Sequence, residues 1–582
     1  MELTEYFTLL DLGETLDFSE TENKLLKFAV LSDSSTQQFT KVLKALFFQK
    51  GTKAQIYESN YDSFANEVLN PSSPLFDFKP KQVLLLFSTQ KYREEFLEAS
   101  VENKNNFAEQ RISILKNYCR VLEELRVQVI VNTFPLPVER QFGNYSLRTS
   151  QSLYASIVEF NRKLVELTST HSSVSLLDCM YLSAKIGSEN FFNEKLWVMA
   201  KSFCDNAYLP TVAKEVVSIS RNLDGATSKC VVVDLDNTLW GGIIADDGLE
   251  GIEVGRTGAG ESHLALQRYL LSLKQRGYFL AVCSKNEERN AKLPFEKHNE
   301  MLLKLEDFSV FIANWRPKSE NIFSIAKQLN ISTSSIVFLD DSGFERDEVR
   351  TRLPDVEVPE LPEDPADYVS QLEQGGYFET MAISKEDLLR SQSPTLESMV
   401  ELQSRFQSFE DYLSHLEMKL EVRRFNPVDL PRIAQLIQRS NQFNVRTQRY
   451  TLSQCEKVML EKEKFITFSF SLKDKLTDYG LIAIVVAGWE NQVLKVDELL
   501  MSCRVLKRGV EEYLLNQLVS FAASKSCTSI NIDFIKTEKN QLARDYIENS
   551  GFKKMPNTES YFLDLKTFQP FNCYFKEVSL HE

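Results

Sequence analysis

The stretch Cys230-Val231-Val232-Val233-Asp234-Leu235-Asp236-Asn237-Thr238 (CVVVDLDNT) decides the fold in the middle of the chain. Its apolar, mostly β-branched start predicts a buried strand, and the polar residues predict where that strand ends. Side chains two residues apart on an extended chain face the same side, so Asp234 and Asp236 converge beyond the carboxyl end of the strand. Open α/β sheets bind ligands at that edge. Two carboxylates there predict a site for a hard divalent cation such as Mg²⁺.

Three later segments carry side chains that suit the same chemistry. The strand candidate YFLAVCSKN (278–286) ends near Ser284, and SIVFLDDS (335–342) ends in Asp340 and Asp341. Between them, NWRPKSEN (314–321) supplies the cation Lys318. Phosphoryl transfer needs a nucleophile, a metal cluster and fixed positive charge for the phosphate oxygens. The four segments together predict such a site.

In this order, the four segments resemble the four motifs of the haloacid dehalogenase (HAD) superfamily. The resemblance implies a Rossmann-like domain in which Asp234 is the nucleophile, forming an aspartyl-phosphate, and Asp236 is the general acid/base. It implies that Thr238 and Ser284 hold the phosphate through hydrogen bonds and that Lys318 neutralises phosphate and nucleophile together. The magnesium ligands that it implies are Asp234, Asp236, Asp340 and Asp341.

The amino-acid sequences of these motifs resemble a narrower group within the superfamily. DLDNTLWGG (234–242), CSKN (283–286), NWRPKSENI (314–322) and VFLDDSGFERDEV (337–349) look like the FkbH-like branch of HAD proteins, which is associated with polyketide assembly lines. That resemblance implies an enzyme that takes 1,3-bisphosphoglycerate, removes phosphate, and places the glyceryl group as a thioester on a phosphopantetheinylated acyl carrier protein. The insert after the first motif is about 45 residues long and shows no separate cap domain. An open site suits a carrier-bound partner, although a small phosphate ester would also enter it.

Cys283 allows two interpretations. The resemblance suggests that its thiol carries the glyceryl group before the carrier takes it, and a thiolate near Lys318 and Mg²⁺ would be activated. The alternative is a small apolar side chain that packs the strand. Consecutive strand residues face opposite sides, so Ser284 in the site would turn Cys283 away.

The first domain, residues 1–225, alternates continuous apolar runs with helical segments, which predicts a parallel, doubly wound sheet. Its strand candidates are 27–31, 82–87, 127–132 and 174–177, and helical spacing covers 37–49. The run LSDSST (31–36) resembles the opening block of the SGNH hydrolase fold, with Ser34 at the nucleophile position. That family places a His three residues after a late Asp, but here Tyr181 follows Asp178. A hydroxyl nucleophile needs a base, so we expect a structural or carrier-docking domain.

The HAD-like domain spans 226–380, a helical linker 381–417, and a third, mixed α+β domain 418–582. In the third domain, the run 503–509 (CRVLKRG) before an amphipathic helix resembles the pyrophosphate loop of GNAT acyltransferases, with Lys507 where the first Gly is expected. Arg504, Arg508 and Gly509 are the residues that this resemblance would place at a pantetheine arm. The alternative is a domain with a packing role only.

Composition excludes several classes of protein. The 582 residues are 43% hydrophobic and 26% charged, as in globular proteins, and the net charge of −15 argues against a nucleic-acid-wrapping surface. Nine cysteines without a CxxC pair argue against a disulfide framework or a zinc site. The acidic start has no basic signal-peptide region, and the longest apolar run, 481–489, is too short to span a bilayer. We therefore expect a cytoplasmic enzyme without a membrane partner.

Two other functions stay open. A plain HAD phosphatase acting on a small phosphate ester or phosphoprotein would release phosphate without a carrier. A carrier-binding scaffold would function without Asp234, yet the acids, serine and lysine of the four motifs are all present.

Overall fold

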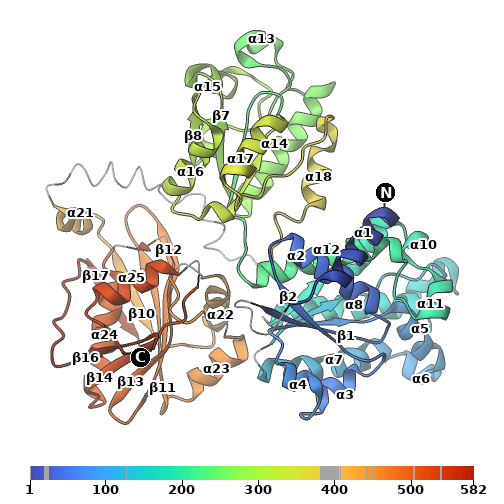
Figure 1. The fold of residues 1–582 in the computed structure, drawn as a ribbon, viewed down its shortest axis with the longest axis horizontal. Coiled ribbons are helices and arrows are strands. Elements are labelled where there is room, and N and C mark those ends of the chain that lie inside the picture. Colours follow the sequence, from blue (N-terminus) through green and yellow to red (C-terminus); the bar gives the residue numbers. More distant parts are fainter. Residues whose placement is uncertain are drawn as a thin grey trace. The chain divides into compact units, whose positions relative to one another are not determined.

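The computed structural model describes residues 2–18, 25–125, 127–171, 173–380, 388, 406, 408–440, 443–447, 450–502, 505–506, 508–537, 540–556 and 558–581. It divides into two compact units, Met1–Asp224 with Arg449–Gln454, and Gly225–Gln448 with Cys455–Glu582. Three separate sheets, each with its own helices, organise the chain (Figure 1). The predicted multidomain α/β architecture with parallel sheets is confirmed.

The first unit holds a parallel sheet of five strands in the order β2-β1-β3-β4-β5. Its apolar runs are buried because helices cover them, and the predicted helix at 37–49 is α2. The strands are β1 (Leu26–Ser32), β2 (Ala54–Glu58), β3 (Gln82–Leu86), β4 (Gln128–Asn132) and β5 (Val174–Leu177). The helices are α1 (Glu2–Thr15), α2 (Gln37–Gln49), α3 (Phe64–Leu69), α4 (Pro74–Phe78), α5 (Thr89–Glu98), α6 (Val101–Lys104), α7 (Phe107–Glu124), α8 (Leu153–Thr170), α9 (Cys179–Ile186), α10 (Ser188–Phe191), α11 (Glu194–Ala200) and α12 (Leu209–Leu223), with 3-10 turns η1 (Gly143–Arg148) and η2 (Asn206–Tyr208).

The second sheet, also parallel, has the order β8-β7-β6-β9. Successive residues of β6 enter different hydrophobic clusters, Val231 on one side of the sheet and Val232 on the other. The strands are β6 (Cys230–Val233), β7 (Phe279–Ser284), β8 (Val310–Ala313) and β9 (Ile336–Leu339). The helices are α13 (Ile244–Gly251), α14 (Ala259–Gln275), α15 (Glu288–Lys297), α16 (Lys318–Gln328), α17 (Gly343–Arg352) and α18 (Tyr368–Gln374), with 3-10 turns η3 (Leu305–Asp307), η4 (Thr333–Ser335) and η5 (Pro365–Asp367).

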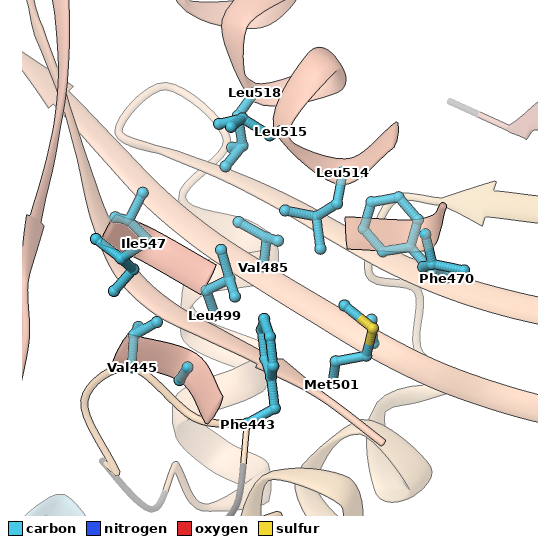
Figure 2. Packing of buried hydrophobic residues seen from close by; sticks show 14 of the residues in the cluster. Phe443, Val445, Phe470, Val485, Leu499, Met501, Leu514, Leu515, Leu518 and Ile547 are labelled. Carbon is cyan, nitrogen blue, oxygen red and sulfur yellow. The ribbon is translucent and has the colours of Figure 1, made fainter. Parts of the chain in front are cut away.

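The third sheet is mixed and has the order β15-β16-β14-β13-β12-β11-β10-β17. Figure 2 shows Leu514 and Leu518 of α24 among the apolar side chains, Val485 and Leu499 with them, that form the core of this domain. The strands are β10 (Lys419–Arg423), β11 (Phe465–Lys473), β12 (Asp478–Glu490), β13 (Val493–Met501), β14 (Ser529–Asp533), β15 (Lys553–Lys554), β16 (Ser560–Asp564) and β17 (Glu577–His581). The helices are α21 (Phe409–His415), α22 (Leu430–Arg439), α23 (Leu452–Leu460), α24 (Val510–Ser524) and α25 (Gln541–Asn549).

The predicted helical linker, 381–417, lies largely outside the described residues. Its last part forms α21, whose Tyr412 and Leu413 belong to the hydrophobic core of the third domain. Within the described part of the chain, no helix combines the length and the apolar character needed to cross a membrane.

Candidate active site

The predicted acidic residues meet at the carboxyl edge of the second sheet. Asp234 follows β6, and Asp340 and Asp341 follow the neighbouring strand β9. Each of the three offers a carboxylate oxygen, and these oxygens all lie within 4.8 Å of one another. The Oδ1 atom of Asp234 is buried and has no hydrogen-bond partner in the structure. A buried acceptor without a donor is costly, so this oxygen is available for a cation or a reacting group.

Lys318 places a positive charge inside this cluster. It is the first residue of α16, and its Nζ lies 2.9 Å from Oδ2 of Asp234 and also pairs with Oδ2 of Asp340. All three side chains are buried, so little water screens the pairs. Burial alone would lower the pKa of Lys318, but Asp234 and Asp340 outweigh it and raise the pKa above its ordinary value. The lysine is therefore a fixed cation at this site.

The two consecutive acids after β9 are held by the start of the following helix. The amide of Ser342 donates to Oδ1 of Asp340 over 2.9 Å. The guanidinium of Arg346 donates to the backbone carbonyls of Asp340 and Asp341 over 2.8 and 2.7 Å. Burial, with a contribution from the charge of Asp234, raises the pKa of Asp340 to about 7 and also raises that of Asp341. Both carboxyls are thus in an environment that favours an added positive charge.

The side chain of Asp236 is not one of the three converging acids, and its role as a magnesium ligand stays a prediction. Its Oδ1 accepts from the indole Nε1 of Trp240 over 2.9 Å and from the amide of Ile244 over 3.0 Å. Its Oδ2 accepts from Nδ2 of Asn286 over 2.7 Å. Three donors thus occupy the carboxylate, and it is not among the three acids whose oxygens converge. Burial raises the pKa of Asp236 above its ordinary value.

The backbone conformation of Asn237 and Gly242 fixes the turn after β6. Asn237 has a positive φ of 55°, and its side-chain Oδ1 accepts from the amide of Gly242, which itself has a φ of 88°. This fold of the loop buries Thr238 completely and leaves its Oγ1 3.5 Å from Oδ1 of Asp341. Nδ1 of His263 lies 2.9 Å from the Thr238 carbonyl oxygen. The hydroxyl therefore faces the acids, as its predicted phosphate-binding role requires.

Ser284 and Cys283 differ in their surroundings although they are neighbours on β7. The buried Ser284 lies next to Asn286, whose Nδ2 is 3.5 Å from Oγ of Ser284 and also donates to Asp236. Cys283 is fully buried in the hydrophobic cluster that includes Ile322 and Ile325 of α16. Burial raises the pKa of the Cys283 thiol well above its ordinary value, so the thiolate is disfavoured. The structure supports the packing interpretation of Cys283 over the acyl relay.

With this geometry established, the chain can be compared with known proteins. Residues 27–221 match the FkbH N-terminal domain family. The structure is similar to that of the N-terminal part of the protein BF1531 from Bacteroides fragilis, which contains a phosphatase domain and was crystallised with Mg. The two are 32% identical with a TM-score of 0.60, and the match covers 65% of this chain and 99% of that one. The chain belongs to the FkbH family.

Other comparisons add little for this FkbH-family protein. Among curated proteins, none matches the chain. The ribosomal-protein-S18-alanine N-acetyltransferase of Escherichia coli is 13% identical, with 27% of this chain and 99% of that one covered and a TM-score of 0.20. The PaiA N-acetyltransferase of Thermoplasma acidophilum, solved with coenzyme A, is 10% identical, with 25% and 98% covered and a TM-score of 0.20. At such scores these likenesses identify neither the fold nor the activity of the third domain. The match to BF1531 supports an enzyme of the HAD type.

Three residues of the site were missed by sequence reasoning in this FkbH-family chain. Asn286 ends the quoted CSKN segment, but nothing in one sequence shows that its amide reaches Asp236. Trp240 lies within the quoted segment DLDNTLWGG, and it is fully buried with its indole bound to Asp236. Arg346, in the segment after β9, holds backbone carbonyls that only the folded turn brings together.

The residues predicted in the flanking domains have these positions. Ser34 is buried with its Oγ 2.8 Å from Oγ of Ser32, and Asp178 caps α9 by accepting from the amide of Tyr181. Arg504 lies outside the described residues. Arg508 is buried, pairs with Asp474 and lies over the ring of Tyr479. Gly509 caps α24 with a φ of 82°.

Proposed function

We propose that this FkbH-family protein is a magnesium-dependent, phosphoryl-removing acyltransferase that converts 1,3-bisphosphoglycerate to a glyceryl thioester on an acyl carrier protein. The observation that carries the phosphoryl chemistry is the convergence of Asp234, Lys318 and Asp340, with a free, buried oxygen on Asp234. The glyceryl group and the carrier rest on the resemblance to FkbH-like sequences and on the family match of residues 27–221.

The residues present fit a magnesium ion. Hard divalent cations take carboxylate oxygens, and Asp234, Asp340 and Asp341 offer three that converge. The unpartnered Oδ1 of Asp234 supports the fit, because a cation would satisfy it. These three side chains would hold the ion, and when bound it would offset the negative charge of phosphate beside the nucleophile.

The chain's own residues would carry out phosphoryl removal as follows. A carboxylate oxygen of Asp234 attacks phosphorus and displaces the alcohol oxygen, to which Asp236 gives a proton. Lys318 stays charged and neutralises the transferred group, while the hydroxyls of Thr238 and Ser284 donate to its oxygens. Water then hydrolyses the aspartyl-phosphate, with Asp236 accepting the proton. The raised pKa of Asp236 favours the protonated form that the first step needs.

1,3-Bisphosphoglycerate carries two phosphates, and acyl transfer releases the one on the acyl carbon. Attack of the carrier thiol on the acyl carbon forms the C–S bond and breaks the C–O bond to the acyl phosphate, which leaves as inorganic phosphate. Removal of the phosphate ester through Asp234 consumes one water and releases the second phosphate. Since Cys283 is buried and its thiolate disfavoured, the proposal has the carrier thiol attack directly.

The flanking domains would serve the carrier. We interpret the first as an SGNH-like domain without hydrolase activity that is structural or docks the carrier, and the third as a GNAT-like domain that guides the pantetheine arm. The sequence motif assigns this contact to Arg504, Arg508 and Gly509, and the pairing of Arg508 with Asp474 leaves Arg504 as the residue to test. Arg504→Ala should weaken carrier affinity without loss of phosphatase turnover; unchanged acyl transfer would contradict this role.

Intact-protein mass spectrometry tests the proposal. Enzyme, Mg²⁺ and freshly generated 1,3-bisphosphoglycerate are incubated with and without a phosphopantetheinylated carrier. We expect a glyceryl adduct on the carrier that is absent with Asp234→Asn and present with Asp355→Asn, an exposed aspartate of the same domain. Phosphate release with no adduct on any carrier would favour the plain phosphatase, and formation of the glyceryl adduct by Asp234→Asn would contradict the role of Asp234; neither phosphate release nor an adduct would favour the scaffold.

A further inference from the structure

A small cavity lies within the first unit, at the carboxyl ends of β1, β3 and β4, and its volume is about 70 Å³. Its walls are largely aromatic. Two of the rings pack closely, with the centroids of Tyr92 and Phe134 4.7 Å apart. The aromatic residues that line it are Phe64, Phe87, Tyr92, Tyr118, Phe134 and Phe160.

One buried carboxyl group also lines this cavity. Asp33, directly after β1, is 6% exposed, and its Oδ1 accepts from the amide of Ser88 over 2.8 Å. The two cations of the cavity already have other partners, since Lys91 lies 2.8 Å from Asp62. Arg111 likewise pairs with Glu95.

No ion pair reaches Asp33 from any residue that the structure describes. Burial, with a smaller contribution from the charge of Asp62, raises the pKa of this carboxyl to about 7 and outweighs the hydrogen bonds from Ser88 and the charge of Lys91, which lower it. The protein itself therefore offsets only part of the negative charge of an ionised Asp33, and a bound cation would offset the rest.

The aromatic walls and the carboxyl group of Asp33 favour the same kind of ligand, a cation. Aromatic faces attract a cation through their quadrupole, and an anion would be repelled by both the rings and Asp33. A cavity of this size holds roughly five water-sized groups, which is the scale of an ammonium nitrogen with its attached carbons. We propose that the first domain binds a small alkylammonium ion in this cavity, with Asp33 as its counter-ion and the aromatic rings as its walls. This inference does not depend on the chemistry of the middle domain.

The cavity is distinct from the serine that marks the SGNH-like motif. Ser34 is not among the cavity-lining residues, and its hydroxyl lies 2.8 Å from that of Ser32, which donates to the carbonyl of Leu86. The buried serine therefore does not line the proposed cation site.

Isothermal titration of the full-length protein at pH 8 tests the inference, with choline and its uncharged isostere 3,3-dimethylbutan-1-ol as probes. We expect choline to bind with a Kd at least tenfold lower than that of the alcohol. Asp33→Asn keeps an acceptor for the Ser88 amide and should remove this preference, whereas Asp77→Asn, at an exposed aspartate outside the cavity lining, should keep it. No choline binding, or a preference that survives in Asp33→Asn, would overturn the proposal.

A second variant and a second probe complete the test. Phe64→Leu keeps an apolar wall but removes a ring, and should weaken choline severalfold more than it weakens the alcohol; equal weakening would contradict the cation–π role. The far-ultraviolet circular dichroism spectrum of Asp33→Asn should match that of wild type, which confirms folded protein. Cosedimentation with phosphatidylcholine vesicles should be absent, and its presence would overturn a free ion as the ligand.

Discussion

Lys318 lies between two buried carboxylates, and at the scale of single residues this is the most consequential contact of the molecule. Each acid alone would be costly to bury, and together they would repel. The lysine makes the pair stable in the folded chain while leaving Oδ1 of Asp234 without a partner. The same arrangement thus offsets the charge of both acids and leaves one oxygen of Asp234 available.

Substitution of Lys318 by Met tests both functions of this side chain. We expect phosphatase activity to fall by roughly 10³-fold, because one preorganised charge is lost. We expect unfolding in EDTA to be easier by about 3–5 kcal/mol, since two buried acids lose their partner. Added Mg²⁺ should raise the melting temperature more in this variant than in wild type. Lys327→Met, an exposed position on the same helix, is the control and should leave all three measurements unchanged.

Asp33 gives a pH-dependent stability that can be predicted with its sign. Burial raises its folded-state pKa from the ordinary 3.8 to about 7, so the folded chain holds this proton more tightly than the unfolded chain. Its contribution to stability is complete below pH about 4 and is lost as the pH rises to about 7, at up to about 1.4 kcal/mol per pH unit. Urea unfolding from pH 4 to 8 should show this slope in wild type and in Asp77→Asn, an exposed aspartate of the same domain. An identical slope in Asp33→Asn would contradict the assignment.

At the scale of elements, the turn between β6 and α13 decides whether Thr238 faces the acids. Gly242 has a φ of 88°, and a Cβ added there would lie 2.7 Å from Oδ2 of Asp247, which accepts from the amide of Ile243. Gly248, inside α13, also has a positive φ of 65° but would meet nothing within 4 Å. Alanine at Gly248 would therefore add backbone strain only, whereas alanine at Gly242 would add strain and also displace the turn.

We expect Gly248→Ala to cost about 1 kcal/mol of stability and to leave kcat unchanged, because only strain is added. Gly242→Ala should cost more, about 2 kcal/mol, and lower kcat at least tenfold, since the displaced turn carries Thr238. Denaturant unfolding and phosphatase kinetics measure both effects. Equal kcat values in the two variants would show that the turn does not position the site.

Sequence reasoning missed two strands of the parallel sheets, β2 and β8, and their sequences differ in kind. The predicted strands of the two parallel sheets are continuous apolar runs, and β6 and β9 are buried along their whole length. β2 (AQIYE) lies at the edge of its sheet, is half-buried along most of its length and carries no such run, whereas β8 (VFIA) is a continuous apolar run that sequence reasoning overlooked. Asp236 shows the corresponding limit in the site. Its spacing predicts a position beside Asp234. The three donors to its carboxylate are Ile244 at the start of α13, Trp240 in the turn before it, and Asn286 after β7, and only the folded chain brings them together.

At the scale of the whole molecule, the hydrophobic cores described for the middle domain come from one continuous stretch of chain. The cores of the middle domain are drawn from residues between Cys230 and Phe378. Its two ends are tied together, because Oγ of Ser228 donates to the carbonyl of Tyr377 over 2.8 Å. Because these cores contain only residues of the middle domain, we expect this domain to fold without the rest of the chain.

A fragment of residues 225–380 should therefore unfold cooperatively and hydrolyse p-nitrophenyl phosphate with Mg²⁺ at a rate within about threefold of the full chain. The same fragment should fail to form the glyceryl adduct on a carrier, because the proposal assigns carrier binding to the flanking domains. Calorimetry, phosphatase kinetics and mass spectrometry of the carrier measure the three properties. Full adduct formation by the fragment would mean that the middle domain alone recognises the carrier. A folded but inactive fragment would mean that the phosphoryl site needs a contact from outside residues 225–380, and the self-contained site argued from Asp234, Lys318 and Asp340 would be wrong.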